Sequence, residues 1–269
     1  MPNVFLTGAS AGIGLTTAKR LTGEGFQVWG TSRDISRLPN LKNFHPLQLN
    51  LNDSQSIETA FRRALAEAGA LDILINNAGC GYFAPLEHLS PEIWQEQLQT
   101  LLLGPLQLIR LALPVMKQKK GLIINVASLA ARFPLPFMSP YNASKAALHS
   151  LTQTLRLELG PRSPVQVVEL QPGDIRTPFH DSMRCQSQTE DYASAMKNAH
   201  AVMTRNIQAA PPPEKVAEII LRIIRAPSPK PLYKAGDFFQ TALAPLGSRL
   251  FPAALLERAL RLFYRLDEK

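Results

Sequence analysis

Short apolar runs rich in β-branched residues alternate along this chain with longer segments whose apolar residues recur at helical spacing. This alternation is typical of a parallel sheet covered by helices. The run Leu71–Asn76 is almost entirely apolar, as expected of a strand buried on both faces. We therefore predict an α/β fold, a doubly wound parallel sheet in a single domain. The predicted strands are Asn3–Thr7, Phe26–Ser32, Phe44–Leu49, Leu71–Asn76, Gly121–Ala127, Val165–Leu170 and Pro231–Ala235. Helices are expected to begin near Gly12, Asp53, Pro91, Pro140 and Pro213.

Two segments interrupt the alternation. Residues 178–212 are polar with scattered methionines and aromatic residues, and a stretch of this length usually forms a lid over a functional site. The tail, residues 236–269, is separate from the main domain at 1–235 and carries an amphipathic helical stripe. Such a helix could contact a membrane surface, or pack on its own domain or a second subunit. The stripe comprises Phe251, Leu255, Ala259, Leu262, Phe263 and Leu266, with Arg258, Arg261 and Arg265 beside it.

Charge and cysteine content narrow the class of protein. The 29 Lys and Arg residues outnumber the 21 Asp and Glu residues, which gives a formal net charge of +8. This balance suits anionic partners, but the basic residues are dispersed without a nucleic-acid-binding motif, so no nucleic-acid partner is expected. No uninterrupted apolar run reaches the roughly 18 residues of a membrane span, so no transmembrane helix is predicted. Cys80 and Cys185 suit a reducing cytoplasm, and neither they nor the scattered histidines have metal-ligand spacing.

A glycine-rich turn, Thr7–Gly14, lies between the first predicted strand and helix. Glycines let a backbone approach a pyrophosphate, which the helix N-terminus stabilises, so this turn indicates a Rossmann-like dinucleotide site. The same stretch contains Gly-Ala-Ser-Ala-Gly, the pattern of a hydrolase nucleophile elbow. An elbow serine needs earlier strands and an upstream oxyanion donor, whereas only seven residues precede this motif, so the phosphate site is favoured. The candidate ligands are Gly8, Ser10, Gly12, Ile13 and Gly14.

Arg33 follows the second predicted strand, about twenty residues after the turn. In a dinucleotide fold this strand end meets the adenosine ribose, where an arginine accommodates a 2′-phosphate. A guanidinium suits phosphate because it offers paired donors in one plane. We therefore predict NADP(H) as the cofactor, with Arg37 in support and Asp34 pointing away. The alternative is a solvated loop arginine.

Ser128, Tyr141 and Lys145 form the candidate catalytic group. Tyr141 and Lys145 are four residues apart and share one face of a predicted helix, while Ser128 follows the fifth strand. A tyrosine hydroxyl has a pKa of about 10, which a nearby ammonium lowers toward neutrality. A Tyr-x-x-x-Lys pair is often an ordinary surface pair. Here the pair follows the fifth predicted strand and the glycine turn follows the first predicted strand, and this combination favours the catalytic interpretation.

This series of motifs resembles the classical short-chain dehydrogenase/reductase (SDR) family over about residues 3–178. Further parts of the series are Asn76-Asn77-Ala78-Gly79 and Pro172-Gly173 followed by Thr177. The resemblance implies that Asn77, Ala78 and Gly79 line the adenosine side, which Asp72 supports. It implies that Lys145 also binds the nicotinamide ribose, and that Pro172, Gly173, Ile175 and Thr177 hold the nicotinamide end. It also implies a homodimer or homotetramer.

Two positions depart from the family pattern. Leu101 stands where the family usually has an asparagine that kinks the helix and anchors a water in the proton relay. Leucine cannot hold a water, although Gly104-Pro105 can preserve the bend. Three explanations stay open, namely another relay group, slow turnover, or a binding protein without activity. Asn50 replaces a common aspartate, and its amide still offers an acceptor.

Apolar residues cluster near the candidate catalytic group. The segment Phe133–Met138, together with Tyr82, Phe83, Phe179 and Met183, suggests a pocket for a bulky lipophilic alcohol or ketone of steroid, retinoid or lipid type. The alternative is that these residues only pack the loops. Cys80 is interpreted as a small filler because no histidine is placed to activate it. We therefore predict a carbonyl–alcohol oxidoreductase, with a catalytically weakened NADP(H)-binding sensor or scaffold as the alternative.

Overall fold

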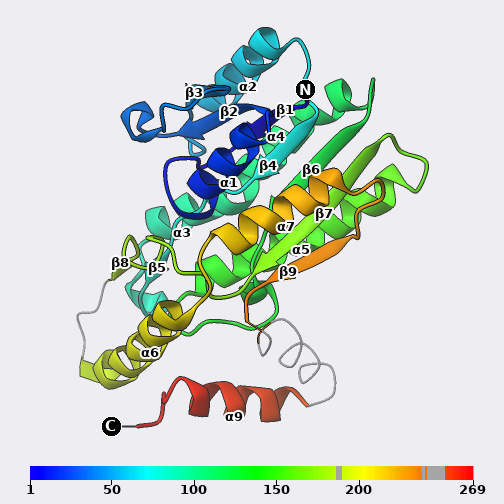
Figure 1. Ribbon diagram of the computed structural model, residues 1–269. Coiled ribbons are helices and arrows are strands. Elements are labelled where there is room, and N and C mark those ends of the chain that lie inside the picture. Colours follow the sequence, from blue (N-terminus) through cyan, green and yellow to red (C-terminus); the bar gives the residue numbers. More distant parts are fainter. Residues whose placement is uncertain (186–189, 238–239, 241–251, 269) are drawn as a thin grey trace.

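Seven strands form one parallel sheet in the order β3-β2-β1-β4-β6-β7-β9 (Figure 1). The computed structural model describes residues 1–185, 190–237, 240 and 252–268. The order reverses beside β1, which pairs with β2 on one side and β4 on the other, so the doubly wound sheet and all seven predicted strands are confirmed. The strands are β1 (Asn3–Leu6), β2 (Gln27–Ser32), β3 (Phe44–Gln48), β4 (Ile73–Asn76), β6 (Gly121–Val126), β7 (Val165–Pro172) and β9 (Leu232–Ala235).

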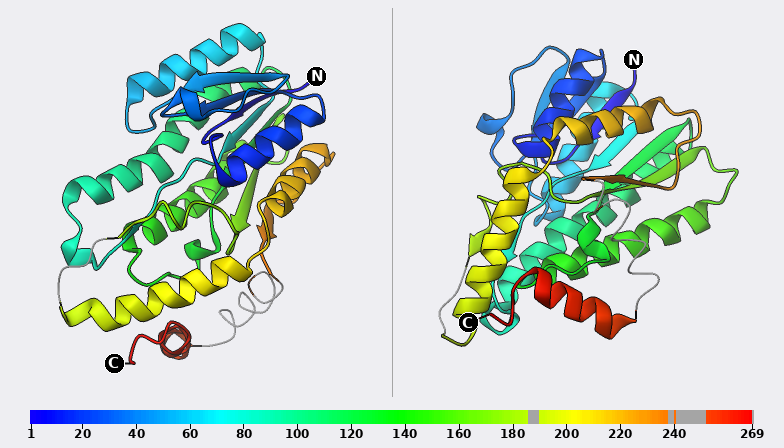
Figure 2. Two further views of the ribbon diagram at one scale, coloured as in Figure 1. Left: turned by 60° about the vertical axis from the view of Figure 1, so that its left-hand side comes forward. Right: turned by 60° about the horizontal axis from the view of Figure 1, so that its bottom comes forward.

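Helices cover both faces of the sheet (Figures 1 and 2). On one face α1 (Gly12–Gly23) and α7 (Glu214–Arg225) pack on a core that includes Leu21 and Ile220. On the other face α2, α4 and α5 pack on a second core that includes Phe61 and Leu108. The predicted helix starts are confirmed to within a residue or two, and Asp53 caps α2 by accepting from the Gln55 N–H at 2.9 Å. The remaining bounds are α2 (Ser54–Ala68), α3 (Pro91–Leu98), α4 (Gly104–Met116) and α5 (Ser139–Leu159).

A π-helical turn, η3 (Gln99–Leu103), joins α3 to α4 and contains Leu101. Pro105, at the start of α4, lacks an N–H, which favours such an irregularity. The combined stretch Pro91–Met116 is long and apolar enough to cross a membrane by length and composition alone, although no uninterrupted apolar run indicated such a span. In this fold one side of the stretch packs against the sheet, because Leu108, Ile109 and Ala112 belong to the second core.

Beyond the carboxyl ends of the strands lie α6 (Glu190–Ala209) and α9 (Ala253–Phe263) (Figure 2). The residues that follow α9 are joined to α6, because Ser194 Oγ donates to the Glu268 carbonyl at 2.8 Å and Asn198 Nδ2 donates to the Arg265 carbonyl at 3.1 Å. The segment expected as a lid therefore contains a long helix that its polar composition did not reveal. It also contains β8 (Arg184–Cys185), which pairs with β5 (Tyr82–Phe83). Of the predicted tail stripe, Phe251 lies outside the described residues.

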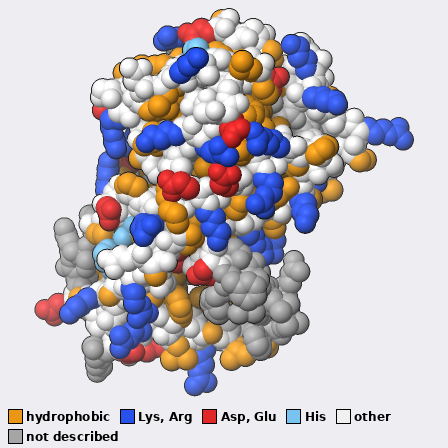
Figure 3. Space-filling model, in the orientation of Figure 1, with side chains coloured by type: hydrophobic (Ala, Val, Ile, Leu, Met, Phe, Trp, Pro, Cys, Tyr) orange, Lys and Arg blue, Asp and Glu red, His pale blue; other side chains and the backbone are white. Residues whose placement is uncertain are grey.

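Basic side chains are scattered over the face shown in Figure 3, with acidic side chains among them. Several arginines of the protein are held in ion pairs, such as Arg20 with Glu24 and Glu218. The net charge of +8 is therefore not gathered into one continuous patch on this face.

Candidate active site

A cavity of about 1260 Å³ opens at the carboxyl ends of the strands and extends to α6 and α9. All of the predicted site residues line it, from Gly8 in the turn after β1 to Thr177 after β7. Because parallel strands end at the same edge of the sheet, motifs separated by more than 160 positions converge here. Among the described residues, no cluster of three or more histidine, cysteine or carboxylate side chains is arranged to hold a metal ion.

The glycine turn has the geometry of a phosphate cradle. Gly8 and Gly12 have φ angles of +71° and +50°, which residues with a Cβ rarely adopt. A Cβ on Gly8 would lie 2.8 Å from the Cα of Ala78. Ala11, which caps α1, offers no side-chain acceptor, so the first N–H groups of the helix remain available to an anion. These observations fit the dinucleotide that the turn predicts.

Asn77 and Thr7 fix the floor of this cradle. Asn77 Nδ2 donates to the carbonyl oxygens of Thr7 and Gly8 at 2.9 and 3.2 Å. Thr7 Oγ1 accepts from the backbone N–H groups of Asn77 and Ala78 at 2.9 and 3.0 Å. Thr7 begins the predicted turn, but its hydrogen bonds to this segment were not predicted. Asp72 requires a correction, because it accepts from the Asn3 N–H at 2.7 Å at the amino ends of β1 and β4, away from the cavity.

Arg33 lies at the end of β2 at the rim of the cavity, with its side chain 65% exposed. Its Nη1 is 3.6 Å from Oε1 of Glu96, a residue of α3 that sequence reasoning missed. Glu96 also accepts from the Tyr82 hydroxyl at 2.5 Å, and Arg184 Nη1 donates to the same hydroxyl at 2.6 Å. Burial and the hydrogen bond to Glu96 raise the pKa of Tyr82 to about 12. An acid–base cluster therefore links the rim of the cofactor end to β8 of the lid segment.

Asp34 and Asn50, near the same rim, are both engaged in local turns. The Asp34 carboxylate accepts from the N–H and hydroxyl of Ser36 at 3.0 and 2.6 Å, which lowers its pKa. It caps the short 3₁₀ helix η1 (Ile35–Arg37). Asn50 Oδ1 accepts from the Asn52 N–H at 3.1 Å. Arg33 and Arg37 line this rim near the end of β2, and so does Asp34, whose Oδ1 is hydrogen-bonded within its own loop.

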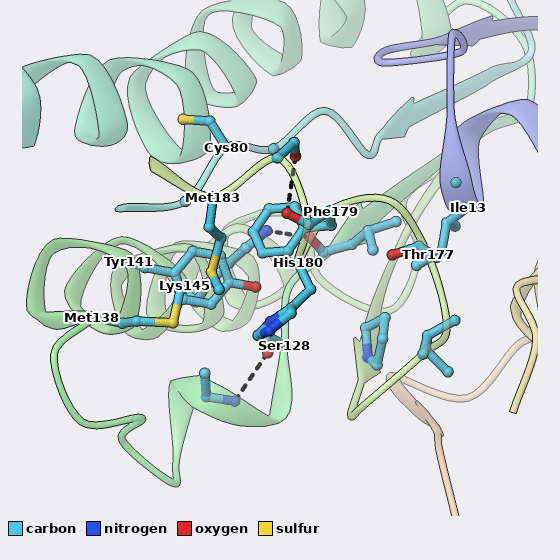
Figure 4. Close-up of a pocket in the computed structure, with 18 of the residues that line it drawn as sticks. Ile13, Cys80, Ser128, Met138, Tyr141, Lys145, Thr177, Phe179, His180 and Met183 are labelled. Atoms are coloured by element: carbon cyan, nitrogen blue, oxygen red, sulfur yellow. Dashed lines mark hydrogen bonds between the residues drawn. The ribbon is translucent and has the colours of Figure 1, made fainter. Parts of the chain in front are cut away.

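Ser128, Tyr141 and Lys145 meet at one wall of the cavity (Figure 4). Ser128 caps the 3₁₀ helix η4 (Leu129–Ala131), where its Oγ accepts from the Ala130 N–H at 3.0 Å. Lys145 Nζ donates to the Val126 carbonyl at 2.8 Å and lies 5.8 Å from the ring centre of Tyr141. The three residue types expected of the catalytic group are therefore adjacent in space.

The pKa values of this group differ from the expectation. Burial raises the pKa of Tyr141 to about 12, although the hydrogen bond with Ser128 opposes that rise. Burial also lowers the pKa of Lys145 to about 8. Burial therefore dominates the pKa of Tyr141 in the protein alone, and its lowering by Lys145 together with a cationic nicotinamide stays a prediction.

Leu101 is buried, with 1% of its surface exposed, and its side chain faces Gly79, where an added Cβ would lie 3.6 Å from Cδ2. It places no polar atom at this position, although the π-helical turn η3 keeps the helix irregular. The bend expected from Gly104-Pro105 is therefore present without a side chain that could hold a water.

The substrate end of the cavity is mostly apolar. Phe179, Met183 and Met138 line it as predicted (Figure 4). Phe133 and Leu135 of the same predicted segment line it too. Phe83 and Phe137 do not line it, because they pack edge to face within the core beneath α6. Burial raises the pKa of the Cys80 thiol, consistent with a filler and not a nucleophile. The apolar lining that sequence reasoning missed comes from α6 and α9, namely Met203, Ile207, Leu256, Leu260 and Phe263.

Residues 2–188 match the protein family described as short chain dehydrogenase. The chain is 32% identical over 265 residues to a 3-ketodihydrosphingosine reductase of Bacteroides thetaiotaomicron, covering 97% of each protein. It is 32% identical over 260 residues to estradiol 17-beta-dehydrogenase 1 of Rattus norvegicus, covering 88% of this chain and 74% of that protein. Among solved structures, the closed form of a serine dehydrogenase complexed with NADP+ is 27% identical, with a TM-score of 0.75 over 87% of this chain and 94% of that one.

Proposed function

Because the chain belongs to the short-chain dehydrogenase family, whose members are nicotinamide-dependent oxidoreductases, we propose that it interconverts a carbonyl and an alcohol on a bulky lipophilic substrate with NADP(H). The observation that carries this proposal is the convergence of Ser128, Tyr141 and Lys145 on one wall of a mostly apolar cavity. The glycine cradle and Arg33 lie at the other end of the same cavity.

Each catalytic side chain has a distinct task in carbonyl reduction. Bound NADPH supplies the hydride that reaches the carbonyl carbon. Tyr141 donates its phenolic proton to the carbonyl oxygen, and Ser128 stabilises the charge that develops on that oxygen. Lys145 carries positive charge beside Tyr141 and favours its ionisation at the moment of transfer. In alcohol oxidation the same groups act in reverse.

The preference for NADP(H) rests on Arg33 and Arg37 at the rim near the end of β2. An acidic side chain at this strand end would favour NAD(H), and Asp34 also lines the rim, but its Oδ1 accepts from Ser36 within its own loop and two arginines flank it. The NADP+ complex of the related serine dehydrogenase is consistent with this choice.

The substrate class rests on the lining of the cavity. Apolar side chains from the Phe133 loop, the lid segment and α9 surround the space next to Tyr141. Such a lining binds an extended hydrocarbon by excluding water from it. Two relatives named for lipophilic substrates, a ketosphingoid base and a steroid, support a steroid, retinoid or lipid-like substrate.

The decisive variant is Tyr141→Phe. We expect it to abolish turnover, a loss of at least about 10³-fold for removal of a general acid, while NADPH binding stays almost intact. NADPH oxidation with 3-ketodihydrosphingosine, and NADP+ reduction with estradiol, measure turnover, and calorimetry measures cofactor binding. Tyr233→Phe on β9, outside the cavity lining, is the matched control. Equal activity of wild type and Tyr141→Phe would refute the assignment.

An NADP(H)-binding sensor or scaffold is the second candidate, and the buried apolar Leu101 favours it. NADPH binding without turnover across a broad panel of lipophilic ketones and aldehydes would support this candidate. Turnover of any member of the panel that depends on Tyr141 would reject it.

The proposal also covers the cellular compartment, the oligomeric state and contact with a membrane. Free thiols at Cys80 and Cys185 suit a reducing cytoplasm. Leu262 and Phe263 of α9 are 67% and 45% exposed beside Arg258, which suits a lipid surface or a second subunit. A homodimer or homotetramer is tested by light scattering, and membrane contact by sedimentation with anionic vesicles.

A further inference from the structure

A buried carboxylate, Glu169 of β7, lies near the catalytic lysine and takes no part in the reaction proposed above. Its side chain is fully buried. Its oxygens accept from Nδ1 of His149 at 2.7 Å and from Nε2 of Gln171 at 2.6 Å. A buried carboxylate is costly unless its partners compensate for lost hydration. Because neither partner carries a permanent charge, an ordinary ion pair does not explain why a carboxylate is buried at this position.

The strand register brings Glu169 toward Lys145. Lys145 Nζ donates to the carbonyl of Val126, and Val126 lies opposite Leu170 in the β6–β7 pair. Glu169 and Gln171 flank Leu170, and side chains alternate along a strand, so both lie on the face that α5 covers. Burial lowers the pKa of Lys145, and the nearby Cys80 and, to a smaller extent, Glu169 oppose that lowering. Gln171 Oε1 is also buried, and it has no hydrogen-bond partner among the described residues.

His149 connects this carboxylate to solvent. It lies one helical turn after Lys145 on α5, so the two side chains share a face of the helix. Its side chain is 22% exposed, and Nε2 lies 3.3 Å from Nη2 of the exposed Arg132. With Nδ1–H donating to Glu169, Nε2 is the acceptor on the solvent side. The buried catalytic wall is thus connected to the surface by a series of three side chains, Lys145, Glu169 and His149.

We propose that His149 and Glu169 carry the proton that recharges Lys145, and through it Tyr141, after each reduction. This inference rests on the proposed function. Tyr141 gives its phenolic proton to the substrate oxygen, and Lys145 Nζ then returns a proton to the Tyr141 phenolate and becomes neutral. Glu169 takes the Nδ1 proton of His149 and passes it to Lys145, while Nε2 of His149 accepts a proton from water. One proton enters from solvent for each proton delivered to the substrate, and no electrons move along the route.

The direction of this route suits the shape of the site. Tyr141 faces the cavity that substrate and cofactor share during turnover, whereas His149 and Glu169 do not line that cavity. A proton that arrives through them therefore does not have to pass the bound substrate. The apolar Leu101, buried on the α3–α4 side, offers no polar atom for a route through its own side chain.

Stopped-flow measurement of Glu169→Gln with NADPH and 3-ketodihydrosphingosine tests the route. At pH 7 Tyr141 and Lys145 both hold their protons, because their pKa values are about 12 and about 8, so the first two turnovers need no resupply. We expect a burst of about two NADPH per site at the wild-type rate, one for each stored proton, followed by a steady-state rate reduced at least about tenfold, since an amide cannot relay the proton. A purely structural role of Glu169 would slow the burst and the steady state together.

His149→Ala provides a second variant at a partly exposed position, where misfolding is a smaller risk. We expect the same burst and slow steady state, with the steady-state rate recovering when imidazole is added to the solution. The matched control is Thr152→Val, which removes a buried hydrogen bond to Asn125 one turn further along α5. It should leave the ratio of burst to steady-state rate unchanged.

The outcomes separate this inference from the proposed function. If the wild type does not oxidise NADPH with any ketone, the proposed function fails and the route fails with it. If the wild type turns over, the route alone is overturned when either variant keeps the wild-type steady-state rate or loses burst and steady-state rates in parallel. Failure of imidazole to restore the steady-state rate of His149→Ala would also overturn the route.

Discussion

The two ends of the cavity are built from different kinds of contact. At the cofactor end, glycines with positive φ and an asparagine bonded to backbone carbonyls leave almost no freedom of residue choice. At the substrate end, methionine, leucine and phenylalanine side chains from the lid segment and α9 supply bulk without specific hydrogen bonds. A phosphate cradle needs backbone geometry that only certain residues adopt, whereas an apolar pocket needs only volume and hydrophobicity.

The largest effect is expected where the cofactor end allows no substitution. Gly8→Ala places a Cβ 2.8 Å from Ala78 Cα at a φ of +71°, so the turn must shift. We expect the affinities for NADPH and NADH both to fall at least about 100-fold, as measured by calorimetry. Gly23→Ala is the matched control, because a Cβ there meets nothing within 4 Å and α1 gains slightly from alanine. Equal binding by the two variants would contradict the cradle.

Arg33→Ala separates cofactor choice from cofactor binding. Removing a charge-assisted contact to the 2′-phosphate should lower the affinity for NADPH about 10- to 100-fold and change the affinity for NADH by less than about twofold. Fluorescence titration of both cofactors measures the ratio. Arg62→Ala, at an exposed ion pair with Glu58 on α2, controls for loss of surface charge. Similar losses for NADPH and NADH would refute the 2′-phosphate role.

Lys145 lies where the two ends meet, and its burial predicts a trade-off between function and stability. Its pKa is about 8 in the folded protein against 10.5 for an ordinary lysine. Below pH 8 Lys145 is protonated in both the folded and the unfolded protein, so the folded state bears the full free-energy cost of a buried charge. Between pH 8 and 10.5 the unfolded protein binds more protons than the folded one, so the stability of the wild type rises with pH.

Lys145→Met should therefore be more stable than the wild type at pH 7, by about 1–3 kcal/mol in free energy of unfolding. That advantage should shrink as the pH approaches 10.5. Urea unfolding at several pH values measures it, and Lys119→Met, at an exposed lysine beyond α4, is the control. A stability difference that does not change with pH would contradict the assigned pKa.

The smallest effect is expected at the substrate end. Leu260→Ala trims one apolar side chain of α9, so KM for a long-chain ketone should rise about 3- to 10-fold. KM for a short ketone and the affinity for NADPH should stay unchanged, because neither reaches α9. Leu157→Ala, at an 83% exposed leucine on α5, is the control. A matching loss of NADPH affinity would show that the two ends are not independent.

The cofactor end and the catalytic wall were predictable because each depends on a residue type with narrow geometry. The glycine turn, Ser128, Tyr141 and Lys145 occur at the ends of predicted strands, and the parallel topology brings strand ends together. The cluster of Glu96, Tyr82 and Arg184 was not predictable, because nothing in the spacing of these residues shows that α3 and β8 meet beside Arg33. The apolar character of Phe83 predicted that it lines the pocket, but in the structure its side chain packs into the core beneath α6.

By itself, the sequence determined the order of strands and helices, the place of the phosphate turn and the identity of the proton donor. Each of these depends on local periodicity or on a residue whose chemistry has few substitutes. Only the tertiary structure decided that α6 and α9 line the substrate end, and that burial raises the pKa of Tyr141 and lowers that of Lys145. It also decided that Glu169 and His149 lie behind the catalytic lysine. These properties depend on contacts and desolvation between segments far apart in the chain, which no local pattern encodes.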